Sequence, residues 1–265
     1  MQKRFNLNLV MTILITVLAI ISTLIGLFTN SYRDNEFVKT AFQANDAVTL
    51  LLLVPLLLTS FAYSFKSERA KLLWQGALLC IVYNYIFYLY GAAFNRLFLL
   101  YVLLIVLSGY TMIVNLAKTD ANAVAAMFNE RTPARLVSGY MFFFALFLGG
   151  VEVAMSLAFV FNGIIPETII KTGHPTAVVF ATDLSVVVSG LIVGGKYLWQ
   201  RKPWGFILSS IVLVKASTYG LGLVATTLFV YYKLGDMDTL LPLWIALTVG
   251  SIISAALLLF NCRRS

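Results

Sequence analysis

Residues 9–29 have the sequence LVMTILITVLAIISTLIGLFT and contain no ionisable side chain. An apolar run of about 20 residues is long enough to cross the hydrocarbon core of a bilayer as a helix. Similar runs recur to the end of the chain, separated by short polar connections. They predict eight membrane spans, at residues 9–29, 47–65, 72–93, 97–116, 136–164, 177–198, 204–231 and 240–260.

Composition points to the same class of protein. Of the 265 residues, 60% are hydrophobic and 11% are charged, against about 25% charged in an ordinary soluble domain. We therefore predict an all-α fold, a polytopic transmembrane helical bundle of about eight spans that forms one membrane-embedded domain over residues 1–265. The net charge of +8 lies in short clusters between apolar runs, so it predicts the lipid bilayer as partner and no nucleic acid.

The basic residues also predict an orientation. With eight spans, thirteen of the nineteen Lys and Arg residues lie on the side of the termini and only five on the other side, with Lys215 inside the seventh span. Short loops rich in Lys and Arg stay in the cytoplasm, so both termini are predicted to be cytoplasmic in a multi-pass protein of the cell membrane. The thirteen are Lys3, Arg4, Lys66, Arg69, Lys71, Lys118, Arg131, Arg135, Lys196, Arg201, Lys202, Arg263 and Arg264.

The two halves of the chain share a weak ordered pattern. Asn45-Asp46-Ala47, then Trp74-Gln75-Gly76, then Tyr90-Gly91 in the first half correspond to Thr182-Asp183-Leu184, Pro203-Trp204-Gly205 and Tyr219-Gly220 in the second. The pattern favours a four-plus-four parallel internal repeat with halves 1–130 and 131–265, a kind of duplication that often forms a cavity where the halves meet. Chance recurrence of interfacial Trp and small residues is the alternative.

Residues 45–108 and two later segments carry a family resemblance. They resemble a group of uncharacterised prokaryotic multi-pass membrane proteins. The resemblance implies a membrane architecture over most of the chain and no particular activity. The residues that carry it are Asp46, Pro55, Tyr83-Asn84-Tyr85, Tyr88, Gly91, Phe94-Asn95, Leu97 to Tyr101, Ser108, Pro175, Asp183-Leu184 and the turn LWQRKPWG at 198–205.

Three ionisable side chains fall inside predicted spans. Lys215 lies about 16 Å from the start of its span, Glu152 about 24 Å from the cytoplasmic end of its span, and Asp183 about 9 Å inside the outer end of its span, at about 1.5 Å per residue. A charge at the bilayer centre costs about 2.5–3.5 kcal/mol on insertion scales. Two alternatives follow: a buried ion pair of Lys215 with Glu152 or Asp183 that holds helices together, or a polar cavity open to the outside with Lys215 at its floor, binding an anion or relaying a proton.

Polar groups of two other spans enrich the same outer half. Asn84 and Tyr88 share one helix face at i, i+4 spacing. Tyr83, Asn84 and Tyr85 are predicted to face the bundle interior, whereas Tyr88 and Tyr90 are also typical of an aromatic belt at the membrane interface. Asp46 falls at the start of the second predicted span, where it would either cap the helix N-terminus or take part in a site.

Few other residues offer chemistry. The sequence has one histidine, His174, and two cysteines, Cys80 and Cys262, so we expect no cofactor and no metal site. It contains no phosphate-binding glycine loop followed by lysine and no serine nucleophile motif.

These features favour an integral membrane transport or small-ligand-binding protein with a polar, outward-facing intramembrane cavity. Its ligand would be a small molecule, an ion or a lipid. The predicted site comprises Asp183, Glu152, Lys215, Asn84 and Tyr88, with Asp46 as a sixth candidate residue. One alternative is an intramembrane enzyme acting on a lipid or isoprenoid, with Asp46 and Asp183 as acid, base or ligands of a divalent ion. Another is a non-catalytic partner or sensor subunit.

Overall fold

The computed structural model describes residues 7–262 and consists mainly of helices, which confirms the all-α bundle. Eight of its helices are long and apolar enough to span a membrane. The basic residues Lys3, Arg4, Arg263 and Arg264, used above to predict orientation, lie outside the described residues. The spans are α1 (Leu7–Phe28), α2 with η1 and α3 (Glu36–Ser64), α4 (Glu68–Gly91), α5 (Phe98–Ala117), α7 (Ala134–Asn162), α9 with η2 and α10 (Val178–Trp199), α11 (Pro203–Leu234) and α12 (Leu241–Phe260).

The second span is longer than predicted, since it begins at Glu36 and not at residue 47. Its first part, α2 (Glu36–Val48), includes Lys39 and Asp46 and therefore lacks a long apolar run. The helix forms nonetheless, because Val38 and Phe42 are buried on one face and the Asn35 side chain caps its N-terminus through the Val38 N–H. Lys39, predicted to lie in an outer connection, is in the first part of α2.

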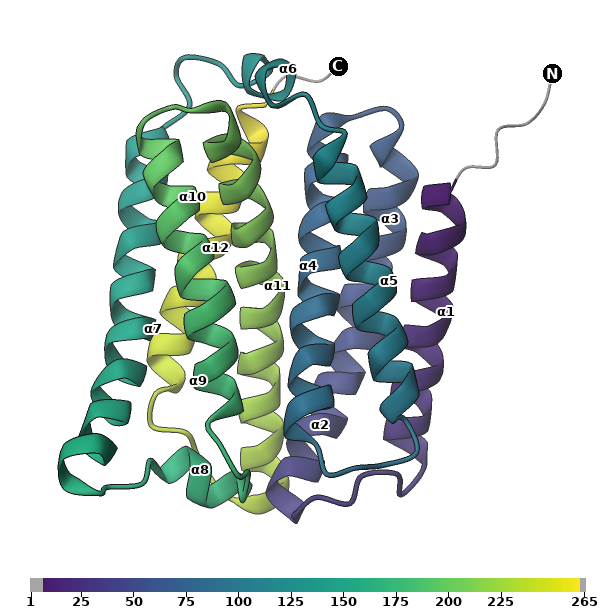
Figure 1. Ribbon diagram of the computed structural model, residues 1–265, viewed down its shortest axis with the longest axis vertical. Coiled ribbons are helices and arrows are strands. Elements are labelled where there is room, and N and C mark those ends of the chain that lie inside the picture. Colours follow the sequence, from purple (N-terminus) through teal and green to yellow (C-terminus); the bar gives the residue numbers. More distant parts are fainter. Residues whose placement is uncertain (1–6, 263–265) are drawn as a thin grey trace.

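The spans form two groups of four that lie side by side (Figure 1). One group contains α1 to α5 and the other α7 to α12, and α4 and α11 pack against each other at the centre. These two central helices are 67% buried over their membrane-spanning windows, whereas the other spans are 28–44% buried. Gly76 permits the close crossing, because a Cβ there would lie 2.5 Å from Val214.

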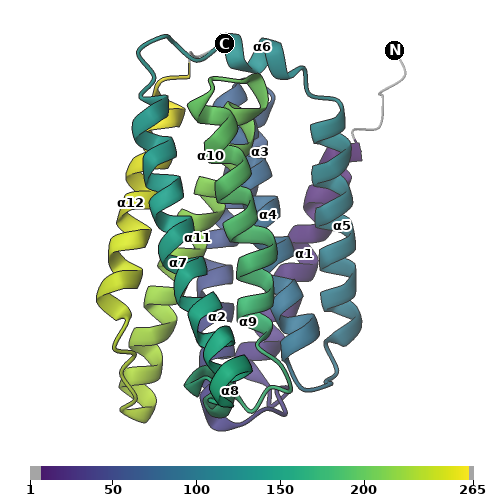
Figure 2. The same cartoon turned by 60° about the vertical axis from the view of Figure 1, so that its left-hand side comes forward.

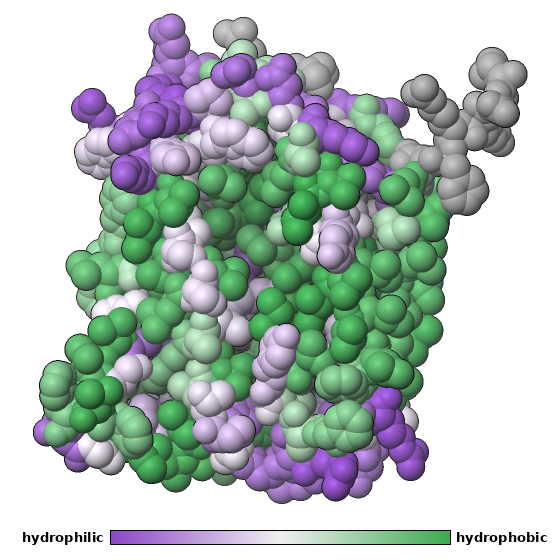
Figure 3. Space-filling model, viewed as in Figure 1, coloured by the Kyte–Doolittle hydropathy of each residue, from purple (hydrophilic) through white to green (hydrophobic). Residues whose placement is uncertain are grey.

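The surface agrees with a bilayer environment. On the face shown in Figure 3, apolar side chains cover the middle of the molecule and polar ones gather at both ends. Large apolar side chains of the spans, such as Leu99, Val160 and Leu146, are exposed. In a soluble protein a patch of this size would be unusual, but lipid tails cover it in a membrane.

Each group contains one span with a π-helical segment. In the first group η1 (Thr49–Leu53) joins α2 to α3 (Val54–Ser64), and in the second η2 (Asp183–Val188) joins α9 (Val178–Thr182) to α10 (Ser189–Trp199). Pro55, the second residue after η1, has no N–H to continue a regular helical ladder. Single π-helical turns occur often at functional sites. The similar position of the two segments is compatible with the predicted repeat, which stays a prediction.

Short helices lie at the two ends of the bundle. At one end of the bundle α6 (Ala121–Ala126) connects the two groups, and Leu7 and Cys262, the first and last described residues, lie at this end as well. At the other end α8 (Glu167–Thr172) lies beneath α9 (Figures 1 and 2). The side chain of Arg69 donates to the carbonyl oxygens of Cys262 and Phe260. The described chain therefore begins and ends at the same end of the bundle, as an even number of spans requires.

Candidate functional site

Two of the predicted site residues, Asp183 and Lys215, meet Tyr83 where the two groups of helices touch. Asp183 lies at the start of η2 and accepts a hydrogen bond of 2.5 Å from the hydroxyl of Tyr83 on α4. Lys215 on α11 places its Nζ 3.2 Å from the centroid of the same Tyr83 ring. Tyr83, Asp183 and Lys215 are all buried. Tyr83 therefore joins the acid and the base, one through its hydroxyl and the other through its ring face.

The arrangement differs from the ion pair expected for Lys215. Among residues 7–262, Lys215 makes no ion pair within 4 Å and no hydrogen bond. Its charge lies instead over the rings of Tyr83 and Tyr219, the latter at 4.5 Å. A desolvated cation over an aromatic ring is stabilised by about 2 kcal/mol, and the carboxyl group of Asp183 still acts on it electrostatically.

Glu152 completes this group of residues from α7. Its side chain is buried, its carboxyl group interacts electrostatically with that of Asp183, and its Oε2 has no hydrogen-bond partner among residues 7–262. The close approach of α7 to η2 depends on Gly149, because a Cβ there would lie 3.2 Å from Val188. We call Glu152, Asp183, Tyr83 and Lys215 the charged cluster.

Asp46 is the centre of a second polar group, and the structure corrects its predicted position. It lies inside α2 and is buried, so it does not cap the helix N-terminus, a role that Asn35 fills. Its carboxyl group accepts hydrogen bonds of 2.5 Å from the Tyr32 hydroxyl and 3.0 Å from the Tyr88 hydroxyl. Tyr88 also donates to the carbonyl oxygen of Phe42 at 3.1 Å.

Amide side chains extend this second group toward the interface. Asn45 donates through Nδ2 to Asn84 Oδ1 at 2.7 Å and to the Tyr88 hydroxyl at 3.0 Å. Asn84 in turn donates to the Thr49 hydroxyl at 3.2 Å. Asn84 thus faces the interior, as predicted, and Tyr88 is buried and hydrogen-bonded there and is not part of an interfacial aromatic belt. We call Tyr32, Asp46, Tyr88, Asn45 and Asn84 the Asp46 network.

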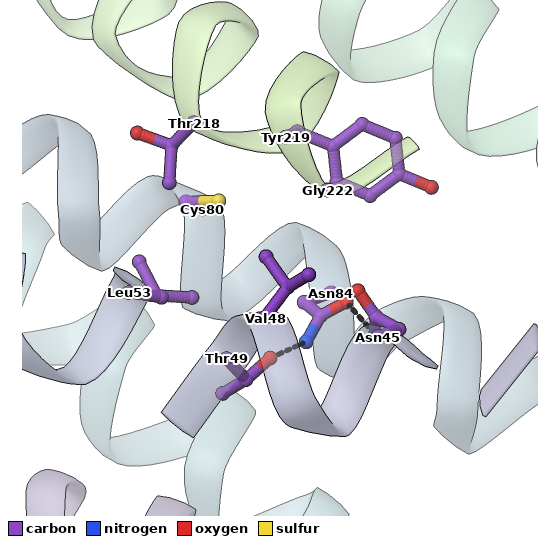
Figure 4. A pocket seen from close by; sticks show the side chains of 9 residues that line it. All are labelled: Asn45, Val48, Thr49, Leu53, Cys80, Asn84, Thr218, Tyr219 and Gly222. Atoms are coloured by element: carbon purple, nitrogen blue, oxygen red, sulfur yellow. Dashed lines mark hydrogen bonds between the residues drawn. The ribbon is translucent and has the colours of Figure 1, made fainter. Parts of the chain in front are cut away.

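A small pocket lies between the Asp46 network and α11 (Figure 4). Asn45, Thr49 and Asn84 line it from one side, and Tyr219 and Gly222 of α11 from the other. It has room for about one water molecule, and Cys80 also lines it. Tyr219 relates the pocket to the charged cluster, because the same ring lies 4.5 Å from Lys215 Nζ.

The six predicted site residues thus fall into two sets. Asp183, Glu152 and Lys215 lie in the charged cluster, whereas Asp46, Asn84 and Tyr88 lie in the Asp46 network, with different hydrogen-bond partners. Sequence reasoning missed Tyr32, Asn45 and Tyr219, and it mentioned Tyr83 without a partner. The only signal for Tyr83 and Tyr219 was that polar side chains inside a span must find partners in the bundle. Tyr32 and Asn45 lie outside the predicted spans and gave no such signal.

The described residues contain no group of three or more His, Cys, Asp or Glu side chains that could hold a metal ion. The two acids of the charged cluster have Tyr83 and Lys215 as neighbours. This set is suited to holding or moving a proton, because it combines two carboxyl groups, a phenol and an amine.

No protein-family model, curated protein or solved structure matches the chain. The resemblance to uncharacterised prokaryotic membrane proteins therefore stays a prediction, and the chain is assigned by its own architecture as a multi-pass α-helical membrane protein.

Proposed function

We propose that this protein is a membrane transport or small-ligand-binding protein whose working site is the charged cluster, and that the site takes up and releases a proton. The single observation that carries the proposal is the position of the cluster across the two groups of helices. Tyr83 comes from the first group, whereas Glu152, Asp183 and Lys215 come from the second. A relative movement of the groups would therefore break both contacts of Tyr83.

Cost supports a functional role. Each buried ionisable group carries an insertion penalty of about 2.5–3.5 kcal/mol, and apolar residues at these positions would avoid it. Lys215 also lacks the close carboxylate contact that a purely structural ion pair would make. A site that exchanges a proton needs groups that are stable in both charge states, and shared partners such as Tyr83 provide that.

Native Cys80 offers a test that leaves the charged cluster intact. The full-length Cys262→Ser protein is reconstituted in liposomes and treated from either side with a membrane-impermeant thiol reagent. A cysteine at Leu104, a fully buried core position, in a Cys80→Ala, Cys262→Ser background serves as the dry control. We expect Cys80 to label much faster than the Leu104 cysteine, and the rate to change when Asp183 is replaced by Asn.

The outcome decides between a working site and a scaffold. Labelling of Cys80 that depends on Asp183 supports a cluster that opens to water. Labelling as slow as that of the Leu104 cysteine from both sides, in protein whose exposed cysteine controls react, would contradict the proposal.

One observation favours a second candidate function, an intramembrane enzyme acting on a lipid or isoprenoid. The carboxyl groups of Glu152 and Asp183 are adjacent, and paired carboxyl groups can act as acid and base. Incubation of the purified protein with an extract of membrane lipids tests this. Turnover that is lost in Asp183→Asn would support the enzyme, and an unchanged lipid profile would reject it for those lipids.

A further inference from the structure

The connection between α7 and α9 forms a strap over one end of the bundle. The strap comprises residues 163–173, contains α8, and has a glycine with positive φ at each end, Gly163 at 67° and Gly173 at 66°. Figures 1 and 2 show it beneath α9, the helix that leads directly into Asp183. The charge distribution predicts that this end of the protein lies outside the cell.

Weak polar contacts hold the strap in place. Asn35 Nδ2 donates to the carbonyl oxygens of Lys171 at 2.9 Å and Thr172 at 3.1 Å. Lys171 Nζ lies 3.0 Å from Asp236 and 3.3 Å from Glu167. No residue of α8 is buried, and exposed ion pairs contribute about 0–1 kcal/mol each. Pro166, directly before α8, is the one buried residue of the strap, so its apolar anchor is small.

The buried side chain that follows the strap is His174. Its imidazole is 9% exposed and lies edge-on to the Phe87 ring of α4, with ring centroids 6.1 Å apart. Its Nε2 is buried and has no hydrogen-bond partner among residues 7–262. A pocket with room for about one water molecule lies between His174, the Thr172 turn and residues 177–180 of α9.

Protonation of His174 is unfavourable in this position. Burial lowers the pKa of its imidazole below the ordinary value, and Asp34 of the α1–α2 connection opposes this effect without cancelling it. Phe87 and Gly91 are its neighbours on α4, and residues 177–180 of α9 include no ionisable side chain. On the strap, Lys171 and Glu167 bind each other and Asp236.

The sign of the pH effect follows from this. Since the pKa of His174 is lower in the closed strap than in water, the closed form binds fewer protons than a form in which the imidazole is solvated. Closure is therefore favoured above the ordinary histidine pKa of about 6.5 and weakens as the pH falls below it.

We propose that the strap is an acid-opened gate that controls access from its own end of the bundle to the charged cluster. This inference rests on the proposed function, because it assigns a regulatory step to the same site. Acidification protonates the His174 imidazole, whose Nε2–H then has no acceptor among residues 7–262. The imidazole moves into water and pulls the strap away from α9.

The test reads the accessibility of α9 beneath the strap. A Cys80→Ala, Cys262→Ser protein carrying Val178→Cys, a buried position, is labelled in liposomes with an impermeant maleimide at about pH 7.5 and about pH 5.5, on either side of the histidine pKa of about 6.5. A Met237→Cys protein, exposed at the same end, corrects for the pH dependence of the reagent. We expect the ratio of the two rates to rise several-fold in acid.

Two variants identify the titrating group. In His174→Gln the ratio should not change with pH, because the amide does not titrate. In Asp34→Asn the rise should be larger, because the carboxylate that favours the charged imidazole in the closed form is gone. A flat ratio in the protein with His174, an equal rise in His174→Gln, or a smaller rise in Asp34→Asn would each overturn the gate. The Asp34 variant keeps the test valid if His174→Gln fails to fold.

The two proposals fail separately. If the Val178 cysteine labels faster in acid but Cys80 does not label, the acid opening of the strap is supported and the proposed function is rejected. If Cys80 labels but the rate at the Val178 cysteine does not depend on pH, the proposed function is supported and the gate is rejected.

Discussion

Gly26 on α1 offers a sharp test of the Asp46 network. A Cβ at this position would overlap Asp46 Oδ2 and lie 2.5 Å from the Tyr32 hydroxyl. Both groups are buried and bonded to each other, so neither can move without breaking that bond. Overpacking costs about 1–3 kcal/mol and loss of the hydrogen bond about 1 kcal/mol or more. We expect Gly26→Ala to destabilise the protein by about 2–4 kcal/mol.

The assay is thermal unfolding of the full-length protein in detergent. At about 2–4 °C per kcal/mol for a chain near this size, the Tm should fall by about 5–15 °C. Gly150→Ala is the matched control, because nothing lies within 4 Å of its Cβ and alanine favours a helix interior over glycine by about 0.5–1 kcal/mol. In an Asp46→Ala background the cost of Gly26→Ala should shrink to under about 1 kcal/mol. An equal Tm loss in both backgrounds would refute the reasoning.

Three further predictions concern the charged cluster and the strap. Tyr83→Phe removes the hydrogen bond to Asp183 but keeps the ring beside Lys215. It should lower the stability by about 1.5–3 kcal/mol, measured as a fall in Tm. The control Tyr232→Phe, at an exposed site, should leave the Tm unchanged. Lys215→Met leaves the carboxyl groups of Glu152 and Asp183 without a nearby cation and should lower the Tm markedly. Adding Asp183→Asn to this variant should restore part of the loss. Strictly additive losses would contradict the coupling of Lys215 to Asp183. The hydrogen bond that Lys171 donates to Asp236 raises the pKa of Lys171, so Asp236→Asn should lower that pKa and speed acetylation of Lys171. Less than about 1 kcal/mol should be lost at neutral pH because the pair is exposed. An unchanged acetylation rate would argue against this prediction.

Hydropathy predicted the number of spans because lipid-facing helices must present apolar side chains whatever they pack against. It failed at the start of α2, where Lys39 and Asp46 interrupt the apolar run while Val38 and Phe42 supply a narrow buried face. Averaging over a window removes such a face from view. Asp46 was consequently predicted at a helix end, although it lies well inside the protein.

The charged residues of the site were found from the sequence, but their partners were not. The high insertion cost identifies Lys215, Glu152 and Asp183 wherever their helices pack, since it depends only on membrane depth. Whether Lys215 contacts a carboxylate or an aromatic ring depends on helix rotation and crossing, which the sequence does not specify. The π-helical segments were not predicted either, because Pro55 lies two residues after the first of them and no proline follows the second at a comparable position.

Helix α4 connects the two acidic sites. It supplies Tyr88 to Asp46 in the first group of helices and Tyr83 to Asp183 in the second. The two residues are five positions apart, about 7.5 Å along one helix at about 1.5 Å per residue. A rotation or shift of α4 would therefore change the hydrogen bonding of both acids together, although no direct contact joins Asp46 and Asp183 among the described residues.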